Sequence, residues 1–188
     1  MRKTLYALTV SFIGLLVLMV LSPTFFAASA DTKVVRIIGV EGFKANSRVF
    51  ATFRFSPGAI QVNQGDVVTF ENLITPDPHT ISIVMESDLP TDITQVFQCG
   101  APGTVCAAVF AAHFPNGFGA NGQPNPPVIP FVNVAGNPSG FVQGNVQGNS
   151  LLVFPGQTAD VTVSAESGTT FQYLCAIHAW MQGEIHVK

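Results

Sequence analysis

Short segments of alternating apolar and polar residues recur along most of this chain, and they constrain its fold more than any other feature. Valine, isoleucine, threonine and phenylalanine dominate these segments, and Gly, Pro, Asn or Asp bounds each one. The segments are 33–40, 48–56, 59–62, 66–72, 79–84, 150–155, 159–165, 169–175 and 183–188. A period of two is typical of half-buried β-strands, and no segment after residue 30 shows a sustained helical period. The pattern predicts an all-β fold, a Greek-key β-sandwich or barrel.

Residues 86–149 break this rhythm. They are rich in Gly, Pro, Asn and Gln, carry little charge and contain several phenylalanines. Because a structureless loop of this length is unusual inside a compact domain, we interpret the segment as a long insertion before the last strands that packs against the sandwich. A short helix is expected within 91–97 or 105–114.

The N-terminus has the pattern of a targeting segment. Arg2 and Lys3 precede an uncharged apolar run over residues 5–21, and small residues follow at Ala28 and Ala30. This pattern predicts a secretory signal peptide over residues 1–30 and a single domain over residues 31–188. An uncleaved membrane anchor is the alternative. In either case the domain is expected outside the cytoplasm, in the periplasm or at the cell exterior.

The charge distribution bears on partners. The chain has 8 basic and 11 acidic residues, and loss of Arg2 and Lys3 would give the domain a net charge of about −5. Nucleic acid is therefore excluded as an expected partner, because little here could neutralise phosphates. No Lys or Arg lies between Arg54 and Lys188, so surfaces built from that stretch should lack positive charge.

Three cysteines are present, an odd number for an exported chain. Cys99 and Cys106 are separated by a turn-forming stretch with two glycines and a proline, which predicts a local disulfide. Cys175 is then left alone. A lone thiol outside the cytoplasm is expected to be either buried and inert or held as a thiolate by a metal.

A metal is favoured by the residues that follow this cysteine. His178 and Met181 continue the spacing C-x-x-H-x-x-M from Cys175, just before the final strand segment. Thiolate, imidazole and thioether are ligands that soft and borderline metals prefer, and two histidines, a cysteine and a long axial methionine make a type 1 copper site. A second histidine must then come from elsewhere in the fold.

Three other histidines could supply that ligand. His79 opens a strand segment directly after a proline-rich turn, so its ring can project from the strand end toward the cysteine loop. His186 alternates with apolar neighbours in the last strand segment and is expected to face solvent. The role of His113 stays open.

The segments 56–80 and 171–187 together resemble the cupredoxins, the group that contains plastocyanin, amicyanin and azurin. The resemblance covers about residues 33–85 and 150–188, and the short ligand loop is most similar to that of amicyanin. It implies one type 1 copper, with His79, Cys175 and His178 as equatorial ligands and Met181 as the axial ligand. Thr80 departs from the pattern, because many members have an asparagine there that steadies the ligand loop.

The resemblance implies an electron carrier that uses Cu(II) and Cu(I). Copper enzymes of the superfamily carry further histidine-rich centres, and this chain has no His-x-His pair. A copper-binding or copper-trafficking module is the alternative function. The expected partners are redox proteins that dock by apolar contact on Ala176, Ile177, Ala179 and Trp180. These apolar neighbours are also expected to shield the thiolate, although Trp180 could equally be part of the core.

Overall fold

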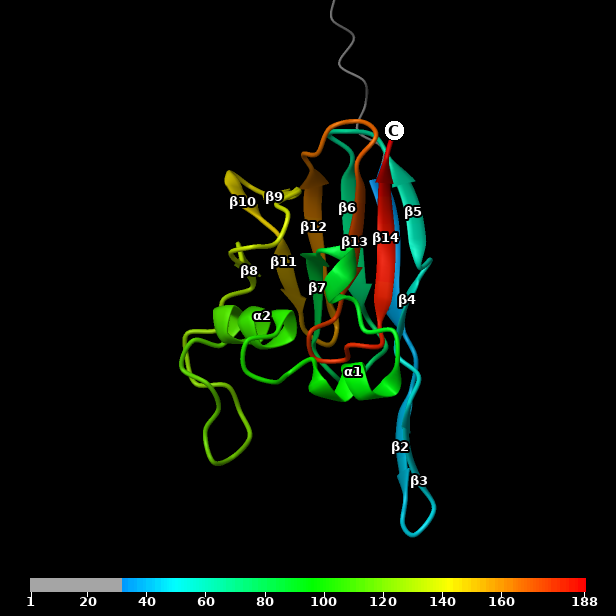
Figure 1. Ribbon diagram of the computed structural model, residues 1–188, viewed down its shortest axis with the longest axis vertical. Helices are drawn as coiled ribbons and strands as arrows, with labels where there is room; N and C mark the ends of the chain where they lie inside the picture. The colour runs from blue at the N-terminus through cyan, green and yellow to red at the C-terminus, as the bar shows by residue number, and fades with distance from the viewer. Residues whose placement is uncertain (1–31) are drawn as a thin grey trace, which may run out of the picture.

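The computed structural model describes residues 32–188, and the predicted signal peptide, 1–30, lies outside the described residues. Two six-stranded sheets form the body of the molecule (Figure 1). The order of strands in the first sheet is β10 (Val146–Gly148), β9 (Phe141–Gln143), β12 (Gln157–Val163), β6 (Val67–Asn72), β1 (Thr32–Ile38) and β4 (Arg54–Ser56). The β1–β6 pair is parallel, and the other pairs of this sheet are antiparallel.

The second sheet carries the C-terminal strand near its edge. Its order is β5 (Ala59–Val62), β14 (Gln182–Val187), β13 (Thr170–Leu174), β7 (His79–Val84), β11 (Ser150–Val153) and β8 (Phe131–Val132). The β5–β14 pair is parallel and the rest are antiparallel. Strands β7 and β13 are neighbours, so the start of β7 and the end of β13 lie together at one end of the sandwich.

The core lies between the two sheets, where alternate side chains of several strands are buried, while β7 and β11 are buried along their whole length. Strands β6 and β14 show this alternation along their full length. The largest buried side chains include aromatic rings from both sheets, among them Phe70, Phe141 and Tyr173. The period of two in the sequence therefore arises because one face of these strands is buried in the core. The predicted all-β sandwich is confirmed.

A two-stranded hairpin projects beyond one end of the sandwich (Figure 1). It consists of β2 (Glu41–Lys44) and β3 (Arg48–Ala51), which pair only with each other. The alternation over 48–56 predicted one strand, but the chain leaves the hairpin at Thr52, whose N–H donates to the carbonyl of Val40 (2.8 Å). Gly39 makes this crossing possible, because a Cβ there would lie 2.6 Å from the Cα of Phe53.

Residues 86–149 are ordered against the sandwich rather than forming a free loop. Both candidate segments form helices, α1 (Ile93–Gln98) and α2 (Val105–His113), and the 3₁₀ turn η1 (Glu86–Asp88) precedes them. Asp92 and Thr104 cap the helices by accepting from the backbone N–H three residues later. Strands β8, β9 and β10 also lie in this segment and were not predicted, because their few residues show no alternation. None of the helices within residues 32–188 is long and apolar enough to cross a membrane.

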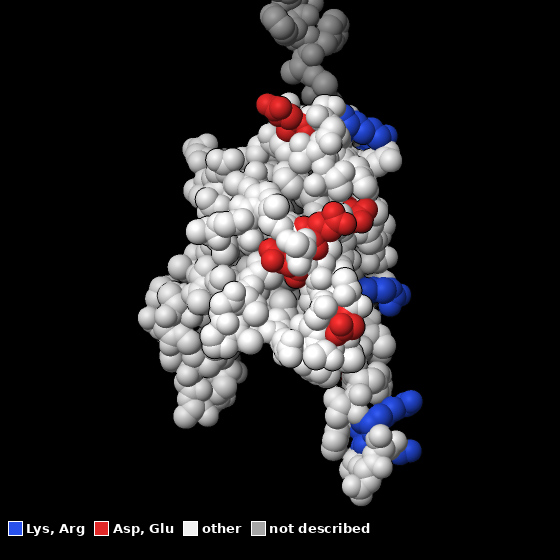
Figure 2. All heavy atoms as spheres, viewed as in Figure 1, with Lys and Arg blue, Asp and Glu red and all other residues white. Residues whose placement is uncertain are grey.

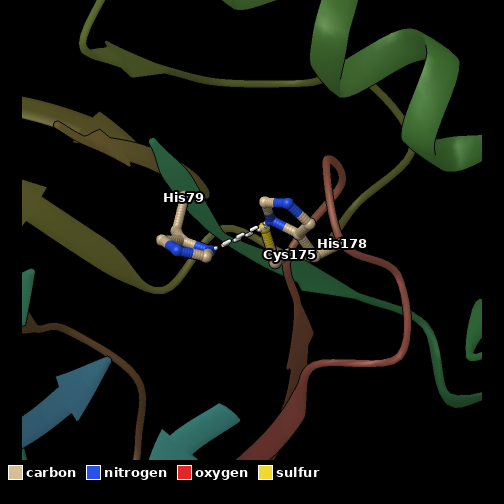
Figure 3. Close-up of side chains that lie close together, drawn as sticks. All are labelled: His79, Cys175 and His178. Carbon is tan, nitrogen blue, oxygen red and sulfur yellow. Dashed lines mark hydrogen bonds between the residues drawn. The ribbon is translucent and has the colours of Figure 1, made fainter. Parts of the chain in front are cut away.

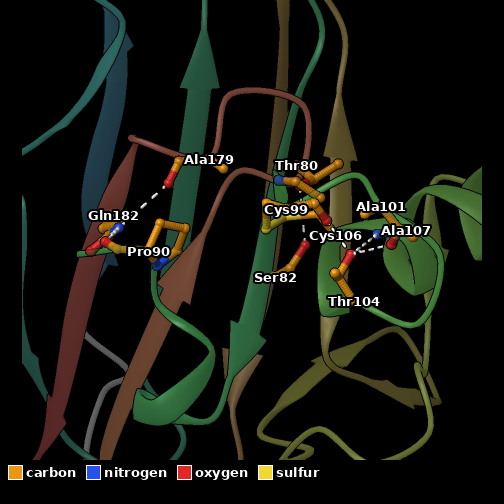
Figure 4. Close-up of a disulfide and its surroundings, with 11 residues drawn as sticks. Thr80, Ser82, Pro90, Cys99, Ala101, Thr104, Cys106, Ala107, Ala179 and Gln182 are labelled. Atoms are coloured by element: carbon orange, nitrogen blue, oxygen red, sulfur yellow. Dashed lines mark hydrogen bonds between the residues drawn. A yellow bond between two sulfur atoms is a disulfide. The ribbon is translucent and has the colours of Figure 1, made fainter. Parts of the chain in front are cut away.

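The predicted disulfide joins Cys99 and Cys106, whose Cα atoms are 5.2 Å apart (Figure 4). Both cysteines are buried in a small cluster with Leu174 and Ala179, which flank the end of β13 and the following loop. Closing so short a loop contributes about 2 kcal/mol in the chain-entropy account. The disulfide thus also packs on the loop that carries the candidate metal ligands.

Candidate metal centre

The four candidate ligands lie at the end of the sandwich from which the hairpin projects. His79 is the first residue of β7, and Cys175 directly follows β13. The loop from Cys175 to Met181 closes through two backbone hydrogen bonds: Cys175 N–H donates to the Met181 carbonyl (3.0 Å), and Met181 N–H donates to the His178 carbonyl (2.8 Å). The three-residue spacing therefore turns the chain so that His178 points back toward Cys175.

Three ligand atoms, one from His79 at the start of β7 and two from this loop, face one another (Figure 3). The Nδ1 atoms of His79 and His178 are 3.2 Å apart, and Cys175 Sγ lies 3.7 Å from the first and 3.8 Å from the second. One ion bonded to all three atoms at about 2.0–2.3 Å, the usual length for such ligands, fits a triangle of this size. Of the described residues these three alone form such a cluster of His, Cys, Asp or Glu.

Met181 lies next to this triangle in the fold. Its side chain is buried and belongs to the same core cluster as Cys175. The other two histidines lie elsewhere: His113 ends α2 and His186 lies in β14, where its ring contacts Thr170 and Glu184. The side chain of His186 is 40% exposed and lies on the solvent side of β14, as its alternation predicted.

The remaining ring nitrogens are held by the turn before β7. His79 Nε2 lies 3.0 Å from the Thr75 hydroxyl, and His178 Nε2 lies 3.4 Å from Asp77 Oδ2. Asn72 accepts from the Thr75 hydroxyl and donates to the Asp77 carbonyl (2.8 Å), so the turn is itself fixed. Such outer contacts orient imidazole ligands. Sequence reasoning missed Thr75 and Asp77, although their place in the turn before His79 was a usable signal.

The electrostatics of the cluster favour uncharged imidazoles. Burial, with a smaller contribution from His178, lowers the pKa of His79 to about 3. Burial also lowers the pKa of His178, and Asp77 partly opposes this shift. Burial raises the pKa of the Cys175 thiol. Neutral imidazoles are ready to coordinate, and a bound metal ion displaces the proton of the thiol.

Thr80 ties the ligand loop to β7. Its N–H donates to Cys175 Sγ (3.4 Å), and its hydroxyl oxygen accepts from the Ala176 N–H (2.7 Å). It therefore links the two ligand-bearing segments at the position where many cupredoxins have an asparagine. Thr80 therefore provides a polar contact across the site although it is not an asparagine.

Aromatic rings cover the imidazoles. The Phe53 ring meets both histidine rings edge-on, with centroids 5.1 Å from His79 and 5.1 Å from His178. Trp180 lies 5.2 Å from the His178 ring, donates from Nε1 to the Phe53 carbonyl (3.1 Å), and is 41% exposed. Trp180 is thus a partly exposed cover for His178 and not part of the core.

The apolar surface around His178 in the structure differs from the sequence prediction at one position. Ala176 and Ile177 are half-buried, whereas Ala179 is only 4% exposed because it packs against the disulfide. Ala179 therefore cannot contribute to a docking surface. The aromatic cover from Phe53 was not predicted.

Fold and site together define a class of protein. A two-sheet β-sandwich with a buried cluster of two histidines and one cysteine, and a methionine closing the same loop, is a cupredoxin, and this donor set is typical of one type 1 copper. The chain belongs to the plastocyanin/azurin family of copper-binding proteins, whose sequence profile matches residues 44–188.

Solved structures of cupredoxins are similar to this chain. A purple cupredoxin from Nitrosopumilus maritimus shares 16% identity with a TM-score of 0.37, and the match covers 83% of this chain and 99% of that chain. An auracyanin from Roseiflexus castenholzii shares 18% identity with a TM-score of 0.41 and coverage of 85% and 98%. An amicyanin from Paracoccus versutus shares 12% identity with a TM-score of 0.35 and coverage of 86% and 86%. No match was found among curated protein sequences.

Proposed function

We propose that His79, Cys175 and His178 would hold one copper, that Met181 would be a fourth, weaker ligand, and that the protein carries single electrons. The observation that carries this proposal is the buried triangle of two Nδ1 atoms and one sulfur. When bound, copper supplies a one-electron Cu(II)/Cu(I) couple. Three firm ligands and one weak one leave no position for a substrate, which favours electron transfer over catalysis.

The protein's own groups keep this couple fast and reversible. Polar contacts of Thr75 and Asp77 with the ring nitrogens, and the hydrogen bond from the Thr80 N–H to Cys175 Sγ, fix the ligand geometry, so little has to move when the charge changes. The Phe53 ring and the buried loop keep water from the imidazoles and the sulfur. A site outside the cytoplasm fits the disulfide, since such bonds persist in oxidising compartments.

A copper-trafficking module with the same ligands is the competing function, and copper retention separates the two. An electron carrier is expected to hold one copper per chain in both oxidation states, because its ligands are preorganised and buried. We expect one reversible one-electron wave in voltammetry and no loss of copper when the reduced protein is incubated with a Cu(I) chelator. Rapid transfer of Cu(I) to the chelator would favour trafficking instead.

The docking surface for a redox partner is, we propose, an apolar groove beside the metal centre. The groove has a volume of about 760 Å³ and lies between the β2–β3 hairpin and α1. Its apolar lining includes Phe43, Phe50, Ile93, Val96, Phe97 and Trp180. Since Trp180 contacts the His178 ring, the groove leads directly to a candidate ligand.

Charge is scarce in this groove. Glu41 is its only charged lining residue, and Figure 2 shows the basic side chains of the hairpin toward its tip, where Lys44 and Arg48 lie. Exposed apolar side chains on both walls, such as Phe43 (77%) and Phe97 (81%), are costly unless another surface covers them. A redox protein with an apolar contact surface would cover these side chains, and weak apolar docking suits rapid turnover.

We expect Phe97→Lys to slow electron transfer to a partner protein by roughly tenfold, since a charge must be desolvated in the groove. Stopped-flow rates with a soluble c-type cytochrome test this, with Val146→Lys as the control. Val146 is also an exposed apolar residue (59%), but it lies on β10, far from the hairpin in Figure 1. Both variants should keep their copper spectrum, and the unmutated rate should depend little on ionic strength. Equal slowing in both variants, or a steep fall of the unmutated rate with salt, would contradict apolar docking in this groove.

A further inference from the structure

A chain of buried polar side chains runs from α2 to the candidate thiolate ligand. His113 Nε2 lies 2.8 Å from Ser150 Oγ, Ser150 Oγ lies 2.7 Å from Ser82 Oγ, and Ser82 Oγ lies 3.1 Å from Thr80 Oγ1. All four side chains are fully buried. The backbone N–H of Thr80 donates to Cys175 Sγ and its hydroxyl oxygen accepts from the Ala176 N–H, so this network of side chains ends beside the sulfur. Figure 4 shows the contact between Ser82 and Thr80 at the start of β7.

The hydrogen on each nitrogen of His113 can be assigned from its neighbours. Nδ1 lies 2.5 Å from the carbonyl of Ile129, which can only accept, so Nδ1 carries a proton. Burial lowers the pKa of His113, and the hydrogen bond to Ile129 partly opposes this shift. The lowered pKa favours the neutral ring. Nε2 is then unprotonated and accepts from the Ser150 hydroxyl.

This assignment fixes the hydrogens further along the chain. The Ser82 hydroxyl has one hydrogen and two oxygen neighbours, Ser150 and Thr80. If Ser150 donated to Ser82 instead of His113, the Ser82 hydroxyl would accept one hydrogen bond and donate a stronger one to Thr80. With the Ser150 hydrogen directed to His113, Ser82 still donates to Thr80 but receives no hydrogen bond from Ser150, so its donation to Thr80 is weaker than it would be if Ser150 donated to Ser82. His113 therefore decides how much hydrogen-bond donation reaches Thr80.

Donation to Thr80 matters because Thr80 bonds the sulfur. Burial raises the pKa of the Cys175 thiol, and hydrogen bonds from the N–H and hydroxyl of Thr80 act in the opposite direction. A hydroxyl that itself accepts a hydrogen bond donates a stronger one. Hydrogen bonds to the cysteine sulfur tune the potential of a blue-copper site, because they withdraw electron density from the metal and favour Cu(I).

We infer that His113 is a positioning residue for the copper thiolate: by accepting the Ser150 hydrogen it weakens the donation from Ser82 to Thr80 and keeps the reduction potential below the value Thr80 would otherwise set. The inference rests on the copper site proposed above. It assigns a task to α2, which lies in the segment 86–149 and carries no metal ligand.

Voltammetry of copper-loaded variants tests the inference. His113→Phe removes the acceptor and should raise the equilibrium constant for reduction roughly two- to fourfold, since cooperative strengthening changes one charged hydrogen bond by a modest fraction. Ser150→Ala should leave it close to the unmutated value, because Ser82 then still donates to Thr80 and receives no hydrogen bond in return. Thr80→Val removes the hydroxyl donor and should shift it the opposite way. His113→Gln, whose amide oxygen can accept from Ser150, should restore the unmutated potential.

His186→Phe is the control, because the half-buried His186 contacts Thr170 and Glu184 and lies outside the network that runs from His113 to Thr80, so it should leave the potential unchanged. Nitrogen-15 NMR of the copper-free protein gives a second readout and should show His113 protonated at Nδ1 alone. An unchanged potential in His113→Phe, an equal shift in Ser150→Ala, a shift of His113→Phe in the same direction as Thr80→Val, or a proton on Nε2 would each overturn the inference. Failure of the copper proposal is distinguishable, because the unmutated protein would then show no reversible copper wave.

Discussion

Cys175→Ser is expected to abolish the intense visible colour of the oxidised, copper-loaded protein. The colour of a type 1 site arises from charge transfer between a thiolate and Cu(II), and Cys175 is the one free cysteine among residues 32–188. Serine preserves the size of the side chain but offers no thiolate. Visible absorption spectra at matched copper occupancy measure the effect, and the band should disappear entirely rather than shift.

Met181→Leu is the matched control for this experiment. It also alters a buried candidate ligand, but it leaves the thiolate and both imidazoles in place. The band should therefore persist, while the reduction potential rises because a weak donor to the oxidised metal is lost. Colour that survives in Cys175→Ser, or an unmutated copper complex without the intense band, would contradict the proposed ligand set.

Much of the candidate site could be predicted from the sequence because its ligands are local. Cys175, His178 and Met181 lie within one turn-forming loop, and their spacing alone indicates a shared metal. His79 could be added because it opens a strand after a rigid turn. The contacts of Thr75 and Asp77 with the ring nitrogens depend on how that turn folds back over the rings, and no periodic pattern reports this.

The sandwich could likewise be predicted, since burial of one strand face leaves a period of two. What could not be predicted depends on contacts between distant segments. The segment 48–56 keeps its alternation through Thr52, yet a hydrogen bond to Val40 divides it into two strands. Ala179 is apolar and small, which suits either surface or core, and only the packing of the disulfide decides that it is buried.

Phe53→Ala is expected to lower the free energy of unfolding by about 3–5 kcal/mol, the usual cost of truncating a buried phenylalanine. Phe53 is 1% exposed and lies where the hairpin returns to the sandwich. Its ring packs against both candidate imidazole ligands, and its carbonyl accepts from Trp180. The truncation therefore leaves a cavity above the metal centre, and water that enters it should also weaken copper retention.

Phe43→Ala provides the comparison, because it removes the same ring from an exposed position on the hairpin (77%) and should change the unfolding free energy by less than about 0.5 kcal/mol. Chemical denaturation of the copper-free proteins measures both values without a contribution from metal binding. Phe53→Leu keeps most of the apolar volume and should recover much of the loss. If Phe53→Ala were no less stable than Phe43→Ala, the Phe53 ring would not be part of the core. Phe53 could then not be the residue that shields the imidazoles from water. If stability fell as expected but copper retention did not, the cover over the histidines would be supplied by Trp180 instead.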